Sequence, residues 1–95
     1  MATIEMKKVH TIGKEAARKR AEDIADRMKE KLAIEWRWVG DAIQFEARSG
    51  AAKGAKGQVA VTDKDIAVIV DLPFFLRPLK GMVEGKIKER LDAIP

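Results

Sequence analysis

The side chains that most often carry chemistry are few in this chain of 95 residues. It contains no cysteine, which excludes disulfides, zinc knuckles and thiol catalysis. His10 is its single histidine, and a catalytic triad would need a nucleophile and a carboxylate around it. The plainer interpretation of His10 is a structural role at a strand–helix junction, such as a hydrogen bond to a nearby carbonyl.

The acidic residues do not suggest acid–base catalysis. A catalytic carboxylate pair needs one member in an apolar setting, whereas the acids here occupy turns, strand edges and polar helix faces. Asp71, beside the most apolar segment, is the partial exception. One histidine also excludes a multi-histidine metal site. We therefore predict a protein that is not an enzyme and that has no catalytic residue, cofactor or metal.

A glycine-rich segment, residues 49–57, has the composition of a phosphate-binding loop but not its spacing. Its glycines fit neither the Rossmann motif nor the P-loop, in which Gly-Lys is followed by Ser or Thr and then by a helix. A hairpin loop is the favoured interpretation. Weak contact with an anion remains the functional alternative, through Lys53 and Lys56.

Three aromatic residues fall in predicted strands. Trp36 and Trp38 are two residues apart and therefore share a face, where they could stack on nucleic-acid bases. Ile34 shares that face, however, and indicates that it points to the core. Trp36, Trp38 and Phe45 are thus predicted to line the core, its rim or a pocket.

The connector Phe74-Phe75-Leu76 is the most distinctive apolar feature. Three consecutive large apolar side chains cannot easily all point inward. Exposed members would favour a partner protein, a lipid-like ligand or a polymer surface. The alternative is that they plug one end of the core. With Met82, they form the predicted interface or apolar-ligand surface.

The elements that position these residues follow from periodicity. Steps of three and four between apolar residues predict helices over residues 14–32 and 79–94, with Pro78 in the first turn of the second. Alternation predicts strands within residues 2–6, 34–38, 43–47 and 58–62. Residues 65–72 are apolar on both faces, so that strand should be central or covered on both sides.

These elements predict one α+β domain over residues 1–95. It should have an antiparallel four- to five-stranded sheet with two amphipathic helices packed on one face, in the order β-α-β-β-β-β-α. The net charge of +4 arises from 19 basic and 15 acidic residues that are interspersed. That balance alone does not indicate nucleic-acid binding. No stretch approaches the roughly 18 apolar residues of a membrane helix, and a cytoplasmic location is expected.

The order of several short motifs resembles the polyhydroxyalkanoic acid system protein family, whose members are associated with bacterial polyester-granule loci. The resemblance extends over nearly the whole chain. It rests on His10 with Ile12-Gly13, Glu15-Ala16-Ala17-Arg18, Trp38-Val39-Gly40-Asp41, Phe45, Gly57 before Val59-Ala60-Val61, Leu72-Pro73 and Arg77-Pro78-Leu79-Lys80. It implies a role in polyhydroxyalkanoate synthesis, storage or use, and assigns no catalytic residue.

Three functions remain open at this point. The first is a non-enzymatic accessory protein that binds a polyester granule or a granule-associated protein. The second is a small hydrophobic-ligand carrier with a helix-grip-like pocket, lined by residues such as Trp38, Phe45, Val68 and Met82. The third, a weak nucleic-acid-binding module, ranks last of these because the charge is dispersed. A homodimer is compatible with all of them.

Overall fold

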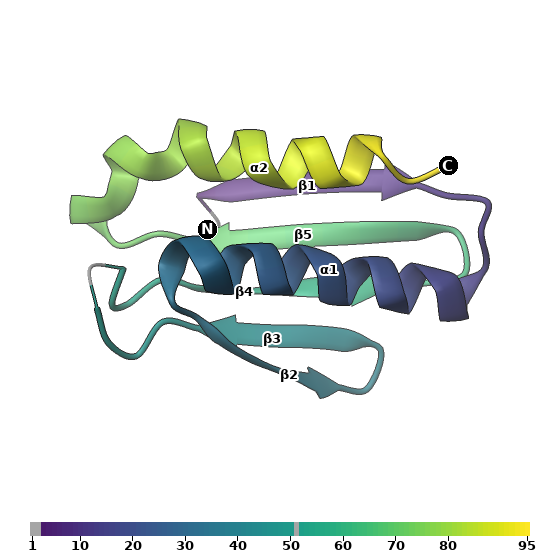
Figure 1. Ribbon diagram of the computed structural model, residues 1–95, viewed down its shortest axis with the longest axis horizontal. Helices are drawn as coiled ribbons and strands as arrows, with labels where there is room; N and C mark the ends of the chain where they lie inside the picture. Colours follow the sequence, from purple (N-terminus) through teal and green to yellow (C-terminus); the bar gives the residue numbers. More distant parts are fainter. Residues whose placement is uncertain (1–2, 51) are drawn as a thin grey trace.

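Apolar residues at every second position build a five-stranded antiparallel sheet. The computed structural model describes residues 3–50 and 52–95. Its strands are β1 (Ile4–Val9), β2 (Glu35–Val39), β3 (Ala42–Glu46), β4 (Lys56–Val61) and β5 (Asp65–Asp71). Their order in the sheet is β1-β5-β4-β3-β2, and every neighbouring pair is antiparallel (Figure 1).

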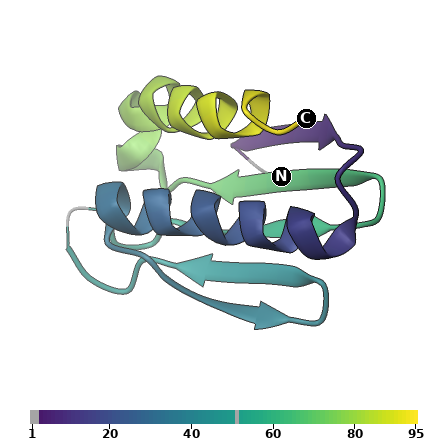
Figure 2. The same cartoon turned by 45° about the vertical axis from the view of Figure 1, so that its right-hand side comes forward.

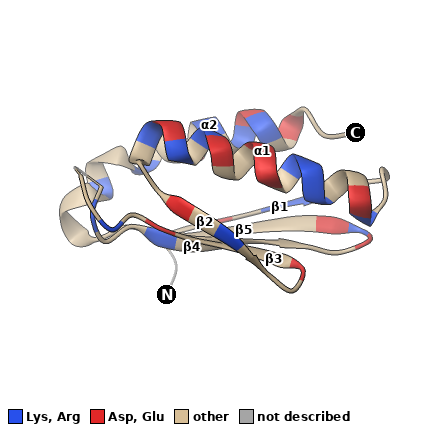
Figure 3. Ribbon diagram, turned by 60° about the horizontal axis from the view of Figure 1, so that its bottom comes forward, with Lys and Arg blue, Asp and Glu red and all other residues tan. Residues whose placement is uncertain are grey.

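Two helices cover one face of this sheet. α1 (Lys14–Leu32) packs over β3, β4 and β5, while α2 (Lys80–Asp92) packs over β1 and beside α1 (Figures 1 and 2). A view along the layers shows α1 and α2 on the same side of the sheet (Figure 3). The predicted α+β fold and its element order β-α-β-β-β-β-α are confirmed.

The buried stripe of α1 explains its close fit to the sheet. Three of its buried positions are alanines, whose small side chains let the helix backbone approach the strands. The stripe consists of Ala17, Ala21, Ile24, Ala25, Met28 and Leu32. Ala33 then adopts a left-handed conformation, with φ 53°, and its N–H donates to the carbonyl of Lys29. This turn ends the helix and directs the chain into β2.

Several predicted boundaries were wrong. β1 runs from Ile4 to Val9 instead of residues 2–6, and position 2 lies outside the described residues. β4 begins at Lys56, two residues earlier than predicted. Residues 74–79 form a short 3-10 helix, η1 (Phe74–Leu79), with Pro78 inside it, and α2 begins only at Lys80. The N–H of Leu76 donates to the carbonyl of Pro73 at 2.8 Å, which starts this tighter turn.

The core between sheet and helices is tightly packed around one glycine. Phe45 on β3 is paired across the strands with Gly57 on β4, and its ring fills the space above that glycine. A Cβ on Gly57 would lie 2.6 Å from Cζ of Phe45 and would also collide with the carbonyl oxygen of Ile69. Gly57 is therefore required by the packing of the sheet rather than by a phosphate ligand.

The opposite face of the sheet is open and polar at its margins. β5 is an interior strand, between β1 and β4, and only its core-facing side is covered by helices. Alternation places on the open face three basic and five acidic side chains of the strands, Lys7, Arg37, Lys56, Glu5, Glu35, Glu46, Asp65 and Asp71. Acidic residues therefore outnumber basic ones on this face.

Candidate apolar docking surface

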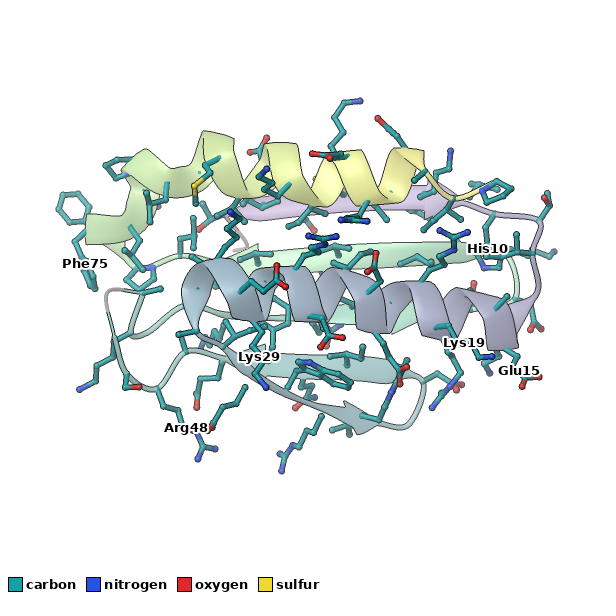
Figure 4. The ribbon with its side chains drawn as sticks, in the orientation of Figure 1. His10, Glu15, Lys19, Lys29, Arg48 and Phe75 are labelled. Atoms are coloured by element: carbon teal, nitrogen blue, oxygen red, sulfur yellow. The ribbon has the colours of Figure 1, made fainter. Side chains whose placement is uncertain are left out.

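The clearest candidate site is the pair of phenylalanines on η1. Phe74 is 87% exposed and Phe75 is 62% exposed, whereas Leu76 is buried in the core. The turn that begins at Pro73 brings Leu76 under the end of the core and leaves its two predecessors outside. Phe75 lies at one extremity of the molecule, beyond the body of the helix layer (Figure 4).

Exposure of this pair is unusual among the described apolar residues. The other large apolar side chains that are exposed are Val9, Val39 and Met82. Val9 and Val39 belong to β1 and β2, the opposite edges of the sheet, so they are isolated from each other. Only Phe74 and Phe75 are adjacent in sequence. At about 1.5–3 kcal/mol for burying each such side chain, the pair can contribute substantially to association with an apolar surface.

Met82 does not extend this surface in a simple way. It lies in the first turn of α2 and is 43% exposed. Its side chain lines a cleft between α1 and α2, together with Met28 and Val83. The structure therefore separates the predicted interface residues into an outward-facing pair on η1, a buried Leu76 and a methionine at the helix–helix cleft.

The two tryptophans lie at the rim of the core and do not form an open stacking platform. The indole N–H of Trp36 donates to Asp26, and that of Trp38 donates to Glu22 at 2.8 Å. Both acceptors belong to α1. The guanidinium of Arg18 lies 3.8 Å from the centroid of the Trp38 ring, which covers part of it. These contacts join the edge strand β2 to α1.

The four side chains expected to line a helix-grip-like pocket are not gathered around one cavity. Phe45 and Val68 are buried in the core cluster under α1, and Trp38 packs at its edge. Met82 instead lines the cleft between the helices. The physical reason is the position of α1. It packs against β3, β4 and β5, on the face of the sheet that a fold with a single gripping helix would leave free for a ligand.

Lys53 and Lys56, the predicted anion contacts, lie in different settings. Lys53 is exposed in the loop, whereas Lys56 begins β4. On the open face, Lys56 is placed across the strands from Glu46 on one side and Asp71 on the other. Two neighbouring carboxylates oppose the approach of a phosphate, which weakens the case for nucleic-acid binding here.

His10 follows β1 and is buried, with 4% of its surface exposed. Its Nε2 lies 2.9 Å from the carbonyl oxygen of Thr62, and its backbone N–H donates to the carbonyl of Lys64. Nδ1 is buried without a hydrogen-bond partner among the described residues. The ring thus joins the end of β1 to the β4–β5 turn, in agreement with a structural role (Figure 4).

One feature was missed by the sequence analysis. The cleft between α1 and α2 has an apolar section and a more polar section, and the same four basic side chains line both, Arg27, Lys31, Lys86 and Arg90. In the sequence, this cluster is indicated by a pair of basic residues four positions apart within each helix. They become one cluster only because the two helices lie side by side.

In residues 3–50 and 52–95, no group of three His, Asp or Glu side chains is arranged to hold a metal ion. No helix in that part of the chain is both long and apolar enough to cross a membrane.

Comparison with known proteins supplies the family. Searches of the curated proteins and of the solved structures each gave no significant match. The family model described as "Putative polyhydroxyalkanoic acid system protein" matches residues 4–94. This range begins at the first residue of β1 and ends two residues after α2. The chain therefore belongs to this polyhydroxyalkanoic acid system family.

Proposed function

We propose that the protein is a non-enzymatic accessory component of the polyhydroxyalkanoate system that binds the apolar surface of polyester granules through Phe74 and Phe75. The observation that carries the proposal is the exposure of these two adjacent rings. The family membership supplies the setting, because it links the chain to polyhydroxyalkanoates.

The geometry of η1 supports a surface-binding role. Leu76 is buried and Leu79 packs against the core, while Phe74 and Phe75 are exposed, so the short helix is held to the core by its two leucines. The exposed rings can therefore insert into an apolar surface without unfolding the segment. An aromatic ring also loses little conformational freedom when it is immobilised, because it has only two rotatable side-chain bonds.

A fluorescent fusion in a polyester-accumulating bacterium tests the granule setting. The wild-type fusion should collect on granules, and F74S/F75S should remain distributed through the cell. The matched control is V9S/V39S, which removes two other exposed apolar side chains from the edges of the sheet. A wild-type fusion that stays away from granules, or an F74S/F75S fusion that still collects on them, would contradict the proposal.

A further inference from the structure

The cleft between α1 and α2 combines a basic wall with an apolar floor. Its polar section has a volume of about 120 Å³ and is lined by six charged side chains, of which four are basic and two are acidic. The basic ones come in equal number from the two helices, Arg27 and Lys31 from α1 and Lys86 and Arg90 from α2. Basic and acidic segments are interspersed along both helices (Figure 3).

The charges in this cleft are incompletely neutralised. Arg27 has Glu30 at 3.6 Å and Arg90 has Asp23 at 3.5 Å, both longer than a well-formed charged hydrogen bond. Among the described residues, neither Lys31 nor Lys86 has a carboxylate within 4.0 Å. Two lysines on neighbouring helices are thus held at one cleft without partners of their own.

An apolar strip continues from the basic section. The same four basic side chains also border a narrow section floored by Met28, Met82, Val83 and Ile87. The free volume of this section is only about 10 Å³, near the space that a single water molecule needs. Methionine side chains are flexible and can change conformation to admit an apolar group, and Met82 is already 43% exposed.

We infer that this cleft binds a small amphiphile, an oxyanion carried on an apolar chain. Lys31, Lys86 and the two arginines hold the carboxylate or phosphate oxygens, since ammonium and guanidinium groups provide charged donors for such groups. The attached chain lies against Met82 and its apolar neighbours. Both carboxylates and monoalkyl phosphates have this chemistry, and it can also be offered by the headgroup of a lipid.

This site is separate from the surface in the proposed function. Phe74 and Phe75 line neither section of the cleft. An amphiphile can therefore bind when the phenylalanines are replaced, and a granule can bind when the cleft lysines are replaced. Failure of one proposal leaves the other standing.

A nuclear magnetic resonance titration of the ¹⁵N-labelled full chain tests the site. Octanoate and octyl phosphate, both monomeric, should saturate and shift amide signals of Met28, Lys31, Val83 and Lys86. Octanol, which lacks the charge, and inorganic phosphate, which lacks the chain, should each bind roughly tenfold or more weakly. Equal binding of octanol or of inorganic phosphate would overturn the proposal.

Matched charge variants separate the cleft from the overall positive charge. K31Q/K86Q should weaken binding of octyl phosphate by roughly tenfold. K19Q/K29Q removes the same charge from exposed positions on the side of α1 away from α2, and should leave the affinity unchanged (Figure 4). Equal loss in both variants, or no loss in K31Q/K86Q, would overturn the assignment of the cleft.

Vesicles of phosphatidylcholine with and without phosphatidylglycerol identify the source of the oxyanion. Binding of the monomeric amphiphiles but not of the anionic vesicles identifies a free amphiphile as the ligand. Binding of the anionic vesicles, lost in K31Q/K86Q and retained in K19Q/K29Q, identifies a lipid headgroup. No binding of any anionic probe would overturn the proposal.

Discussion

The indole N–H of Trp38 donates to a carboxylate oxygen of Glu22 across 2.8 Å, from the edge strand β2 to the helix α1. Arg18, one turn earlier on α1, covers the face of the same ring. Trp38 therefore joins the edge strand β2 to the helix layer in two ways: its N–H donates a hydrogen bond to Glu22, and the face of its ring packs against Arg18. This relationship gives the aromatic pair on β2 a packing role between the sheet and α1.

Removal of the Trp38 N–H should destabilise the protein modestly. Trp38→Phe keeps an aromatic ring under Arg18 but loses the hydrogen bond to Glu22, so the free energy of unfolding should fall by about 1 kcal/mol. Trp36→Phe is the control, because its bond to Asp26 is exposed and longer, at 3.1 Å. Urea denaturation measures both. Equal stability of W38F and wild type would show that the bond contributes nothing.

Asp41 should make stability depend on acid pH. The hydrogen bond from Lys14 at 2.6 Å, together with the charges of Lys14 and Arg18, holds the pKa of Asp41 below its ordinary value of 3.8. The folded state thus favours the ionised carboxylate. Its contribution is complete at pH values above the ordinary pKa and is lost as the pH falls through the lowered pKa.

Denaturation at a series of pH values tests this linkage. Between about pH 5 and pH 2, wild type should lose more stability than Asp41→Asn, which has no carboxylate to protonate. The two curves should converge at the acid end. Parallel curves over the whole series would mean that Asp41 is not stabilised in the folded state.

Gly57 and Gly85 should respond in opposite directions to the same substitution. Gly57→Ala places a methyl group against Phe45 and the backbone of β5, so the free energy of unfolding should fall by about 1–3 kcal/mol. Gly85 lies in the exposed interior of α2 with nothing within 4 Å of an added Cβ. Gly85→Ala should therefore stabilise the protein by up to about 1 kcal/mol. A tolerated G57A would contradict the packing described for the sheet.

The neutral imidazole of His10 should carry its proton on Nε2. A carbonyl oxygen can only accept, so the 2.9 Å contact with Thr62 requires Nε2–H as donor, and Nδ1 is left with a free lone pair. The ¹⁵N chemical shifts of the imidazole distinguish the two tautomers. A proton on Nδ1 would contradict this arrangement.

The spacing of apolar residues along the chain was sufficient to predict most of the fold. The stripe of α1 predicts its bounds, because its buried residues follow helical spacing from Ala17 to Leu32 without interruption. The strand pairs β2–β3 and β4–β5 follow in the same way from alternation around short turns. The end of β1 and the division between η1 and α2 could not be predicted, since they depend on pairing with β5 and on the turn at Pro73.

The candidate surface was only partly visible in the sequence. Three consecutive apolar residues at 74–76 indicate that some must be exposed, but which of them points outward depends on how Leu76 meets the end of the core. The basic cleft needed the positions of both helices, because Lys31 and Lys86 are far apart along the chain. Sequence pattern thus predicts elements better than it predicts the surfaces made between them.

Sedimentation with particles of purified polyhydroxyalkanoate tests whether Phe74 and Phe75 bind the polymer itself, because no other protein is present. Wild type and the control V9S/V39S should pellet with the particles to the same extent, and F74S/F75S should stay in the supernatant. Far-UV circular dichroism should be unchanged in both variants, because all four side chains are exposed. Pelleting of F74S/F75S to the same extent as wild type, or absence of wild type from the pellet, would contradict the account.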